Sequence, residues 1–456
     1  MNLYAFISLF CALQIICLIV AKKSSKDLNN QDDYFLAGKS IRFFPLMMTF
    51  IATQVGGGLL LGAAEEAYQF GWMVLFYPLG ASLGLILLGV GLGRRLAQFK
   101  VSTIAQIFEV TYQSANLKKI ASLLSIISLF MIFIAQIIAS KKFMISLGID
   151  NNLLFMAFWG IVILYTAMGG LKAVVATDVV QAAFFVVIFL LCLGYVLYQD
   201  VDVNLTLLKL SNESSTFNFS KTYSWLFMPL LFMIIEQDMG QRCFAAITPK
   251  TVSKATLYAA FVTFSISMIS VFFGILAKEK GIEVAKGASV LITVINQVTT
   301  PFLAALASCA ILAAIISTAD SLINAISSNL SQDFDLSFIK GNRIRNLQII
   351  TSVIALSGII FSFYFTNVIN ILIQSYELSI SCLFIPILFA LFKKQGNTLS
   401  ATLAITLGAI GFVLFKMIPM ELPKEIFSLM LSAIGFGCGE IISWYSSLEI
   451  KGAQVD

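Results

Sequence analysis

Five small polar residues recur at spacings of three and four in the apolar segment 300–331, so a helix there carries them on one face. The stripe consists of Ser317, Ser321, Asn324, Ser328 and Ser331. Asp320 lies beside the stripe, and Asp178 lies at a similar depth in the apolar segment 173–198. A carboxylate inside a membrane is costly, and by default it marks an ion or solute pathway. Either acid can instead pair with a cytoplasmic Lys or Arg, an alternative that the sequence leaves open.

The apolar segment 43–64 contains Gly56, Gly57 and Gly58 near its middle. Three consecutive glycines cost about 3 kcal/mol of helix propensity relative to alanine. Non-helical backbone persists inside a membrane only where protein or a water-filled cavity satisfies its polar groups. We therefore expect a broken helix that lines a cavity, and the alternative is close packing of a neighbouring helix on the glycines.

A second interruption falls in the apolar segment 223–246. Its polar residues are Glu236, Gln237, Asp238, Gln241 and Arg242. The alternative to a functional site is an ion pair between an acid and Arg242. The two interrupted segments are five predicted spans apart, and an odd number of spans inverts the second repeat relative to the first. Paired broken helices at corresponding positions of two halves indicate a transporter binding site at the membrane midplane.

The composition places these segments in a membrane. Of the 456 residues, 59% are hydrophobic and 12% are charged, whereas an average soluble domain is about 25% charged. The absence of His excludes a Ser-His-Asp triad, His-ligated zinc or haem and an imidazole proton relay. The seven cysteines are spaced widely within apolar runs, so we expect free thiols. We expect neither an enzyme nor a nucleic-acid partner.

Apolar stretches of about 20 residues can cross a bilayer, and the sequence contains thirteen. We predict an all-α polytopic membrane protein with spans at 3–21, 43–64, 71–93, 119–140, 152–168, 173–198, 223–246, 255–277, 300–331, 347–365, 368–392, 398–416 and 425–446. The single membrane domain of 1–456 then divides into a first repeat (43–198), an inverted second repeat (223–392) and peripheral helices (398–446). The loops leave no room for a soluble catalytic domain.

Thirteen spans place alternate loops on opposite sides of the membrane. Most of the 29 Lys and Arg residues, including every Arg, then fall on one side, which the positive-inside rule assigns to the cytoplasm. The first span has no basic residue before it and is followed by Lys22 and Lys23, so we expect a retained helix and not a signal peptide. The N-terminus is expected outside and the C-terminus in the cytoplasm, in a plasma membrane such as the bacterial inner membrane.

Four segments carry more specific information. They are 33–39 (DYFLAGK), 165–181 (YTAMGGLKAVVATDVVQ), Gln241-Arg242 at the end of the seventh span, and 313–321 (AAIISTADS). In order and spacing they resemble the sodium/solute symporter family, relatives of the sodium/proline and sodium/glucose symporters. The resemblance covers most of residues 30–335. It implies a LeuT-like core of helices 2–6 and 7–11, with one extra helix before the core and two after it.

The resemblance implies a sodium site between the broken second helix and the ninth helix. The matching positions are Ala52, Val55, Ala314, Ser317 and Thr318. Unwound backbone carbonyls and two hydroxyls suit a hard cation, because they supply oxygens without a full negative charge in lipid. Na⁺ is the expected coupling ion, and no other cofactor is expected.

The resemblance also assigns Asp178, Asp320 and Ser321 to a second cation site or to the cation exit path. Serine is more usual than aspartate at position 320 in family members with a well-formed second site, which favours transit over binding. The solute is expected against the two broken helices. The residues near it are then Gln54, Gly56, Gly57, Glu236, Gln237 and Asp238. The acids favour an ammonium or quaternary nitrogen, as in an amino acid, an amine or a choline-like solute.

We predict sodium-coupled uptake of a small organic solute by alternating access, with the monomer as the functional unit. A proton-coupled permease of the same fold is the first alternative, and the hydroxyls of Ser317 and Thr318 favour sodium over protons. A membrane sensor or a polytopic enzyme is the second alternative. The sequence contains no kinase domain, no metal-ligand cluster and no nucleophile with a base to support it.

Overall fold

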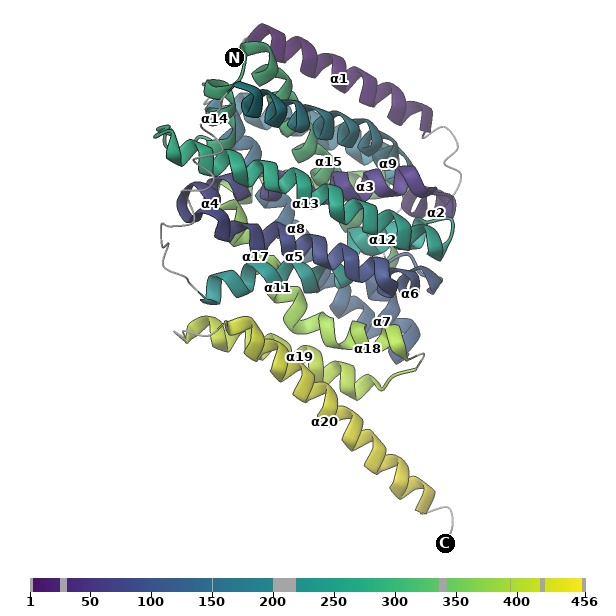
Figure 1. The fold of residues 1–456 in the computed structure, drawn as a ribbon. Coiled ribbons are helices and arrows are strands. Elements are labelled where there is room, and N and C mark those ends of the chain that lie inside the picture. The colour runs from purple at the N-terminus through teal and green to yellow at the C-terminus, as the bar shows by residue number, and fades with distance from the viewer. Residues whose placement is uncertain are drawn as a thin grey trace.

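The computed structural model describes residues 3–24, 31–149, 151–199, 219–335, 343–393, 395–418 and 423–452, and these residues form helices and no strand. The helices run side by side in one bundle (Figure 1). Nine helices in the described ranges are long and apolar enough to cross a membrane, and three shorter apolar helices accompany them. The predicted all-α polytopic fold is therefore confirmed, and the count of thirteen spans stays a prediction.

Several helices are long: α1 (Leu3–Ser24), α8 (Ala115–Ser146), α9 (Asn152–Gln199), whose two parts meet at Gly170, α13 (Pro249–Glu279), α15 (Pro301–Asp333), α16 (Arg343–Phe361), α19 (Thr398–Met417) and α20 (Lys424–Gly452). Others follow one another in shorter pieces: α3 (Phe43–Gln54), η2 (Gly58–Gly62) and α4 (Ala63–Phe70); α5 (Phe76–Leu87), η4 (Leu88–Leu92) and α6 (Gly93–Gln98); α11 (Phe219–Ile235) and α12 (Gln237–Ala245); α17 (Val368–Ser379), η7 (Ile380–Phe384) and α18 (Ile385–Phe392). Short helices α2 (Gln31–Leu36), α7 (Ile104–Tyr112) and α14 (Val290–Val298) complete the set, with three-ten turns at Ala37–Lys39, Gly71–Leu75 and Ser362–Tyr364.

The predicted spans 152–168 and 173–198 both lie within α9, which bends at Gly170 (φ 60°, ψ −176°). A β-carbon at Gly170 would lie 2.7 Å from the backbone oxygen of Tyr34. Glycine is therefore required here twice, once for the backbone conformation and once for the close approach of α2.

Local sequence signals start many of the helices. Thr248 and Thr300 cap α13 and α15 with their side chains, and each is followed by a proline at the first helical position. Asn367 and Asn397 cap α17 and α19 in the same way. These caps satisfy backbone N–H groups that the first helical turn leaves without partners.

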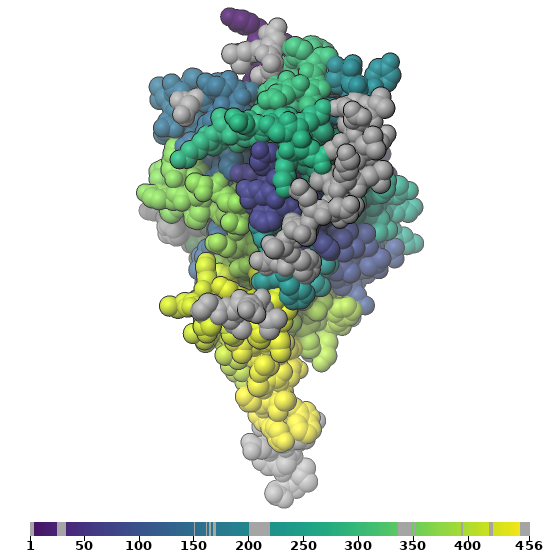
Figure 2. All heavy atoms as spheres, turned by 60° about the vertical axis from the view of Figure 1, so that its left-hand side comes forward, coloured from purple at the N-terminus to yellow at the C-terminus, as the bar shows by residue number. Residues whose placement is uncertain are grey.

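The helices differ in how deeply they are buried. In the most apolar window of α15, 83% of the residues are buried, against 17% in α1 and 28% in α20. α15 packs against α8, α9 and α1. By contrast, α19 and α20 pair with each other on the flank of the bundle opposite α1. The C-terminal part of α20 extends beyond the bundle (Figures 1 and 2). Residues on α15 are thus well placed to face an internal site.

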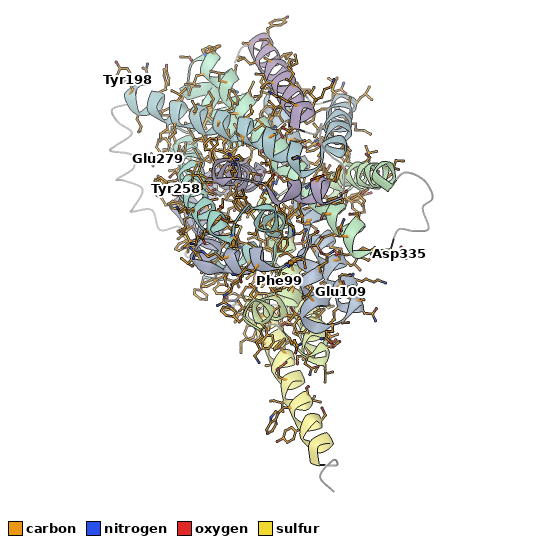
Figure 3. All side chains as sticks on the ribbon, turned by 90° about the vertical axis from the view of Figure 1, so that its right-hand side faces the viewer. Phe99, Glu109, Tyr198, Tyr258, Glu279 and Asp335 are labelled. Carbon is orange, nitrogen blue, oxygen red and sulfur yellow. The ribbon has the colours of Figure 1, made fainter. Side chains whose placement is uncertain are left out.

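The side chains that fill the bundle are shown in Figure 3, where Phe99 and Glu109 mark the chain before and within α7.

All seven cysteines are free thiols, five of them buried. The expectation of unpaired cysteines is therefore confirmed.

Candidate functional site

The first helix break lies between α3 and η2, where the three glycines predict it. α3 ends at Gln54, and Val55 adopts φ −82° and ψ 75°. The N–H of Gly56 donates to the carbonyl oxygen of Gln54 at 3.0 Å. This three-residue turn is an inverse γ-turn, and it takes the backbone out of the helical hydrogen-bonding pattern.

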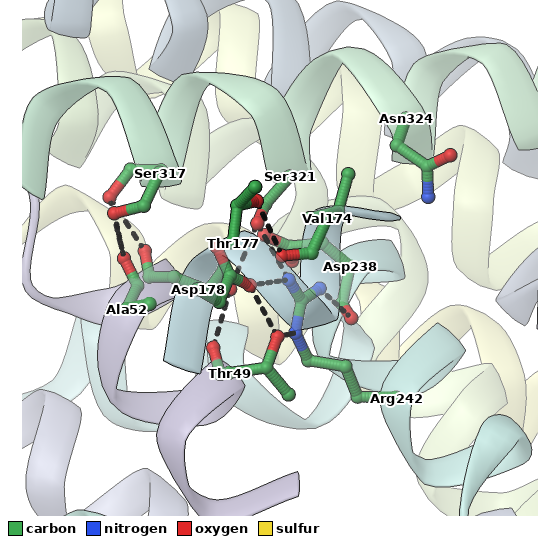
Figure 4. A network of polar contacts seen from close by, with 12 residues as sticks. Thr49, Ala52, Val174, Thr177, Asp178, Asp238, Arg242, Ser317, Ser321 and Asn324 are labelled. Carbon is green, nitrogen blue, oxygen red and sulfur yellow. Dashed lines mark hydrogen bonds and ion pairs between the residues drawn. The ribbon is translucent and has the colours of Figure 1, made fainter. Parts of the chain in front are cut away.

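The predicted sodium ligands from two helices meet at this break. The hydroxyl oxygens of Ser317 and Thr318 lie 3.0 and 3.1 Å from the carbonyl oxygen of Ala52 and 3.0 and 3.1 Å from that of Ala314, so each hydroxyl can donate its one hydrogen to either carbonyl. Figure 4 shows Ser317 on α15 facing Ala52. The structure thus brings two carbonyls and two hydroxyls together, beside the turn at Val55.

Close packing on the glycines, the alternative to a helix break, is present as well. A β-carbon on Gly56 would lie 2.4 Å from Thr318 Oγ1, and one on Gly57 would lie 2.4 Å from the β-carbon of Ala139. Both approaches are too close for any side chain. The glycines therefore serve both purposes, because the unwound segment packs directly on α15 and α8.

The second helix break lies at Glu236, between α11 and α12. Glu236 has φ −69° and ψ 125° and is buried. The side-chain amide of Gln54 donates to Glu236 Oε2 at 3.3 Å. One side-chain contact thus joins the two breaks directly.

Arg242 on α12 forms a buried polar network (Figure 4). Its guanidinium donates to Thr49 Oγ1 at 2.9 Å, to Ser321 Oγ at 2.6 Å and to Asp178 Oδ2 at 3.3 Å. The Thr49 hydroxyl also donates to the same Asp178 oxygen at 2.5 Å. Arg242 and Asp178 are fully buried, and Asp238 contacts Arg242 through its backbone carbonyl oxygen at 2.9 Å.

This network decides between two alternatives. Asp178 pairs with an arginine, as the alternative to a pathway role expects, and this arginine belongs to α12. Arg242 forms its ion pair with Asp178 and not with the acid pair Glu236 and Asp238. Asp320 is buried elsewhere along α15 and accepts a hydrogen bond from the Thr166 hydroxyl.

A small cavity lies between the two breaks. Its lining residues are Thr53, Gln54, Gly56, Gly58, Leu59, Tyr77, Ala81, Ile132, Gln136, Glu236, Asp238, Thr318, Leu322, Leu372 and Tyr376. Four predicted solute-site residues are among them, whereas Gly57 and Gln237 are not. The cavity volume open to water is about 30 Å³, which is room for about two water molecules. A solute larger than that requires the cavity to widen.

Gln237 does not line this cavity and contacts residues 102–104. Its Oε1 accepts from the backbone N–H of Ile104 at 2.7 Å, and its Nε2 donates to the carbonyl oxygen of Ser102 at 3.3 Å. Thr103, between them, donates to Asp333 Oδ1 at 2.8 Å, and Asp333 Oδ2 accepts from Ser122 at 2.7 Å. Residues 102–104 therefore connect α12 to α15 and α8.

Sequence reasoning missed Tyr77, Gln136 and Tyr376. Gln136 carries the one amide side chain in the predicted span 119–140. A polar side chain in an apolar span is the same kind of signal as Glu236 and Asp238. The two tyrosines stand in spans rich in other aromatic residues, so nothing local distinguishes them.

The bundle and its two broken helices define a secondary transporter with a LeuT-like core. A substrate-bound, outward-open structure of a Na⁺-coupled sialic acid symporter matches with a TM-score of 0.77 at 17% identity, over 94% of this chain and 96% of that one. A nucleobase-cation-symport-1 family transporter in a closed conformation matches with a TM-score of 0.61 at 14% identity, over 91% and 96%. The chain belongs to the Sodium:solute symporter family, whose model matches residues 34–408.

Curated relatives transport different solutes, as their names state. The human High affinity choline transporter 1 is 26% identical over 410 residues, which cover 83% of this chain and 70% of the relative. The Sodium/pantothenate symporter of Haemophilus influenzae is 24% identical over 67% of this chain and 66% of its own. The Osmoregulated proline transporter OpuE of Bacillus subtilis is 30% identical over 38% and 36%. The protein is thus a sodium-coupled solute symporter of the membrane, and a transporter rather than an enzyme.

Proposed function

We propose that this symporter takes up a small solute with an ammonium or quaternary nitrogen. The observation that carries the proposal is the charge of the cavity: Glu236 and Asp238 line it, and no Lys or Arg stands among its lining residues in the described part of the chain. Arg242, the nearest basic residue in sequence, already pairs with Asp178. Neither acid forms an ion pair within the described residues, so the acid pair can offer negative charge to a cationic ligand.

The aromatic lining supports the same class of solute. Tyr77 and Tyr376 border the cavity, and the ring of Tyr376 stacks on Phe232 with 4.6 Å between centroids. Aromatic faces attract quaternary ammonium groups through their ring quadrupoles. The human choline transporter among the relatives agrees with this class.

The sodium ion is proposed to bind Ala52, Val55, Ala314, Ser317 and Thr318. In support, the two hydroxyls already lie 3.0–3.1 Å from the carbonyl oxygens of Ala52 and Ala314. An ion entering this cluster replaces hydrogen bonds between neutral groups with ion–oxygen contacts, so no charged side chain has to be desolvated.

We propose Asp178, Asp320 and Ser321 as the inward path of the ion. Thr53 connects this region to the sodium site, because its carbonyl oxygen accepts from Thr318 at 3.1 Å and its hydroxyl lies 3.1 Å from Ser321 Oγ. Asp178 Oδ1 is buried without a hydrogen-bond partner in the described residues. It can therefore accept a passing cation while Oδ2 keeps its contact with Arg242.

The cycle is proposed to be alternating access, with residues 43–198 and 223–392 as inverted repeats and the monomer as the unit. Sodium binding would organise the first break and with it the adjacent solute site. A ligand shifts such an equilibrium only through its different affinity for the two states. Each Na⁺ that moves down about 100 mV supplies about 2.3 kcal/mol, equivalent to about 50-fold in solute concentration.

We place the N-terminus outside and the C-terminus in the cytoplasm of a plasma membrane, as in a bacterial inner membrane. The distribution of Lys and Arg supports this orientation. The two chain ends also lie at opposite ends of the helix bundle (Figure 1), which agrees with an odd number of crossings.

Uptake by proteoliposomes tests the proposal. Membrane-potential change and radiolabelled choline uptake are followed with external Na⁺ or K⁺, and competition is measured with cationic, zwitterionic, neutral and anionic solutes. We expect Na⁺-dependent uptake that cationic or zwitterionic solutes inhibit. Inhibition of Na⁺-driven current by sugars or anions alone would overturn the assignment of the solute class.

A further inference from the structure

Gln136 on α8 lies where the solute cavity meets the first helix break. Its side chain is buried and lines the cavity. Its Oε1 accepts a hydrogen bond from the backbone N–H of Gly57 at 2.7 Å. Gly57 is two residues beyond Val55, whose carbonyl belongs to the proposed sodium site. One side chain therefore borders the solute cavity and the backbone that carries sodium ligands.

The orientation of this amide is fixed by chemistry. A backbone N–H can only donate, so the atom that faces Gly57 is the carbonyl oxygen and the other atom is Nε2. Within the described residues, Nε2 makes no hydrogen bond to the protein, and it is not among the fully enclosed polar atoms. The cavity that Gln136 lines is the space into which its N–H groups can donate.

Gly56 lies beside both the proposed sodium site and the solute cavity. A β-carbon on Gly56 would lie 2.4 Å from Thr318 Oγ1 and 2.8 Å from Gln136 Oε1. The proposed sodium ligand and the cavity amide thus stand close to the same backbone position. Gln136 itself sits on α8, which runs through this region without a break, so its backbone position does not depend on the unwound segment.

We propose that Gln136 is a positioning and specificity residue that couples the two sites. Its oxygen holds the unwound backbone at Gly57, and its nitrogen donates to a hydrogen-bond acceptor on the solute. The inference rests on the proposed function and narrows it. The solute presents its positive nitrogen to Glu236 and Asp238 and an oxygen, from a hydroxyl or a carboxylate, to Gln136.

The coupling follows from the shared side chain. A solute oxygen that binds Nε2 restrains the amide in the orientation that places Oε1 against Gly57. The backbone that carries the Ala52 and Val55 carbonyls is then restrained as well, and sodium binds to it more tightly. By linkage, sodium must raise the affinity for the solute by the same factor.

The test compares choline with propyltrimethylammonium, which has the same quaternary nitrogen and lacks the oxygen. Binding to purified protein is measured by thermal shift at low and saturating Na⁺, for the wild type and for Gln136→Met. A hydrogen bond contributes about 1 kcal/mol, so wild type should prefer choline by about fivefold and Gln136→Met should bind both equally. The sodium dependence of choline binding should also fall in the variant. Ser140→Ala is the matched control, because Ser140 lies one turn away on α8 and bonds Trp159 instead.

Three outcomes are informative. Equal loss of affinity for both cations in Gln136→Met, with the preference for choline retained, overturns the inference and leaves the proposed function standing. If the ratio of choline affinity at high Na⁺ to that at low Na⁺ is the same in Gln136→Met as in wild type, the coupling role is overturned. Failure of both cations to bind wild type at any Na⁺ concentration overturns the quaternary solutes as ligands; if glycine and alanine, which carry an ammonium group, also fail to bind, the proposed solute class falls and the inference with it.

Discussion

The two helix breaks that meet at the cavity differ in charge. The break after α3 offers only backbone carbonyls, and its partners on α15 are the hydroxyls of Ser317 and Thr318. The break at Glu236 carries two carboxylates, and an arginine follows one turn later. One break is thus built from neutral oxygens and the other from formal charges.

The difference reflects what each ligand brings. A bare cation gains enough from several neutral oxygens, and a carboxylate beside it would have to be desolvated in every empty state of the cycle. The larger cationic solute that we propose would be attracted instead by the negative charge of Glu236 and Asp238, together with the aromatic rings of Tyr77 and Tyr376. The buried positive charge of Arg242, which follows this break, needs a negative partner, and Asp178 on α9 provides it.

The largest effect is expected where the charged break is compensated. Arg242→Met leaves Asp178 buried without its partner, and removing one member of a buried ion pair costs about 3–5 kcal/mol. We expect a large fall in the thermal unfolding temperature in detergent. Adding Asp178→Asn removes the orphaned charge and should restore much of the stability. Equal stability of Arg242→Met and wild type would show that the pair is not needed for compensation.

A smaller effect is expected for the solute at the same break. Glu236→Gln keeps the shape and the contact with Gln54 but removes the charge, and hydrogen bonds to charged groups contribute about 1.5–3 kcal/mol. The concentration of a cationic solute for half-maximal uptake should rise at least tenfold, while that of Na⁺ changes little. Sodium dependence is measured at saturating solute, where the coupling through Gln136 does not alter it, and a large change there would show that the charge of Glu236 contributes to sodium binding.

The smallest of these effects is expected at the neutral break. Ser317→Ala or Thr318→Ala removes one neutral oxygen, worth about 1 kcal/mol, so the Na⁺ concentration for half-maximal uptake should rise about fivefold. Ser328→Ala on the same polar stripe is the control, because Ser328 lies outside the cavity and the oxygen cluster. Unchanged sodium dependence in both site variants would count against the proposed sodium site.

The two breaks also differ in how well the sequence predicts them. Gly56 to Gly58, and the acids Glu236 and Asp238, are local signals, and the structure has a break at each. The partners of the neighbouring polar residues are distant in sequence. Arg242 pairs with Asp178, which lies 64 positions away, and Gln237 forms hydrogen bonds with residues 102–104. Sequence spacing places a side chain on a helical face but does not say which distant helix that face meets.

The overlooked residues have the same explanation. Gln136 contributes to the site because α8 passes beside the unwound backbone, a fact of packing between segments 79 residues apart. The predicted spans 152–168 and 173–198 are separated by Gly170, where the backbone is not helical, and the part Gly170–Gln199 is by itself long and apolar enough to cross a membrane.

The short segment 102–104 has a mechanical consequence. One end of this linkage is the amide of Gln237, immediately after the second helix break, and the other is the carboxylate of Asp333 at the end of α15. A tilt of α12 around Glu236 must either pull the segment along or rupture the two hydrogen bonds that Gln237 makes. The segment thus ties the position of α12 just after the second break to the position of the last turn of α15, and neither helix can shift alone without loss of these hydrogen bonds.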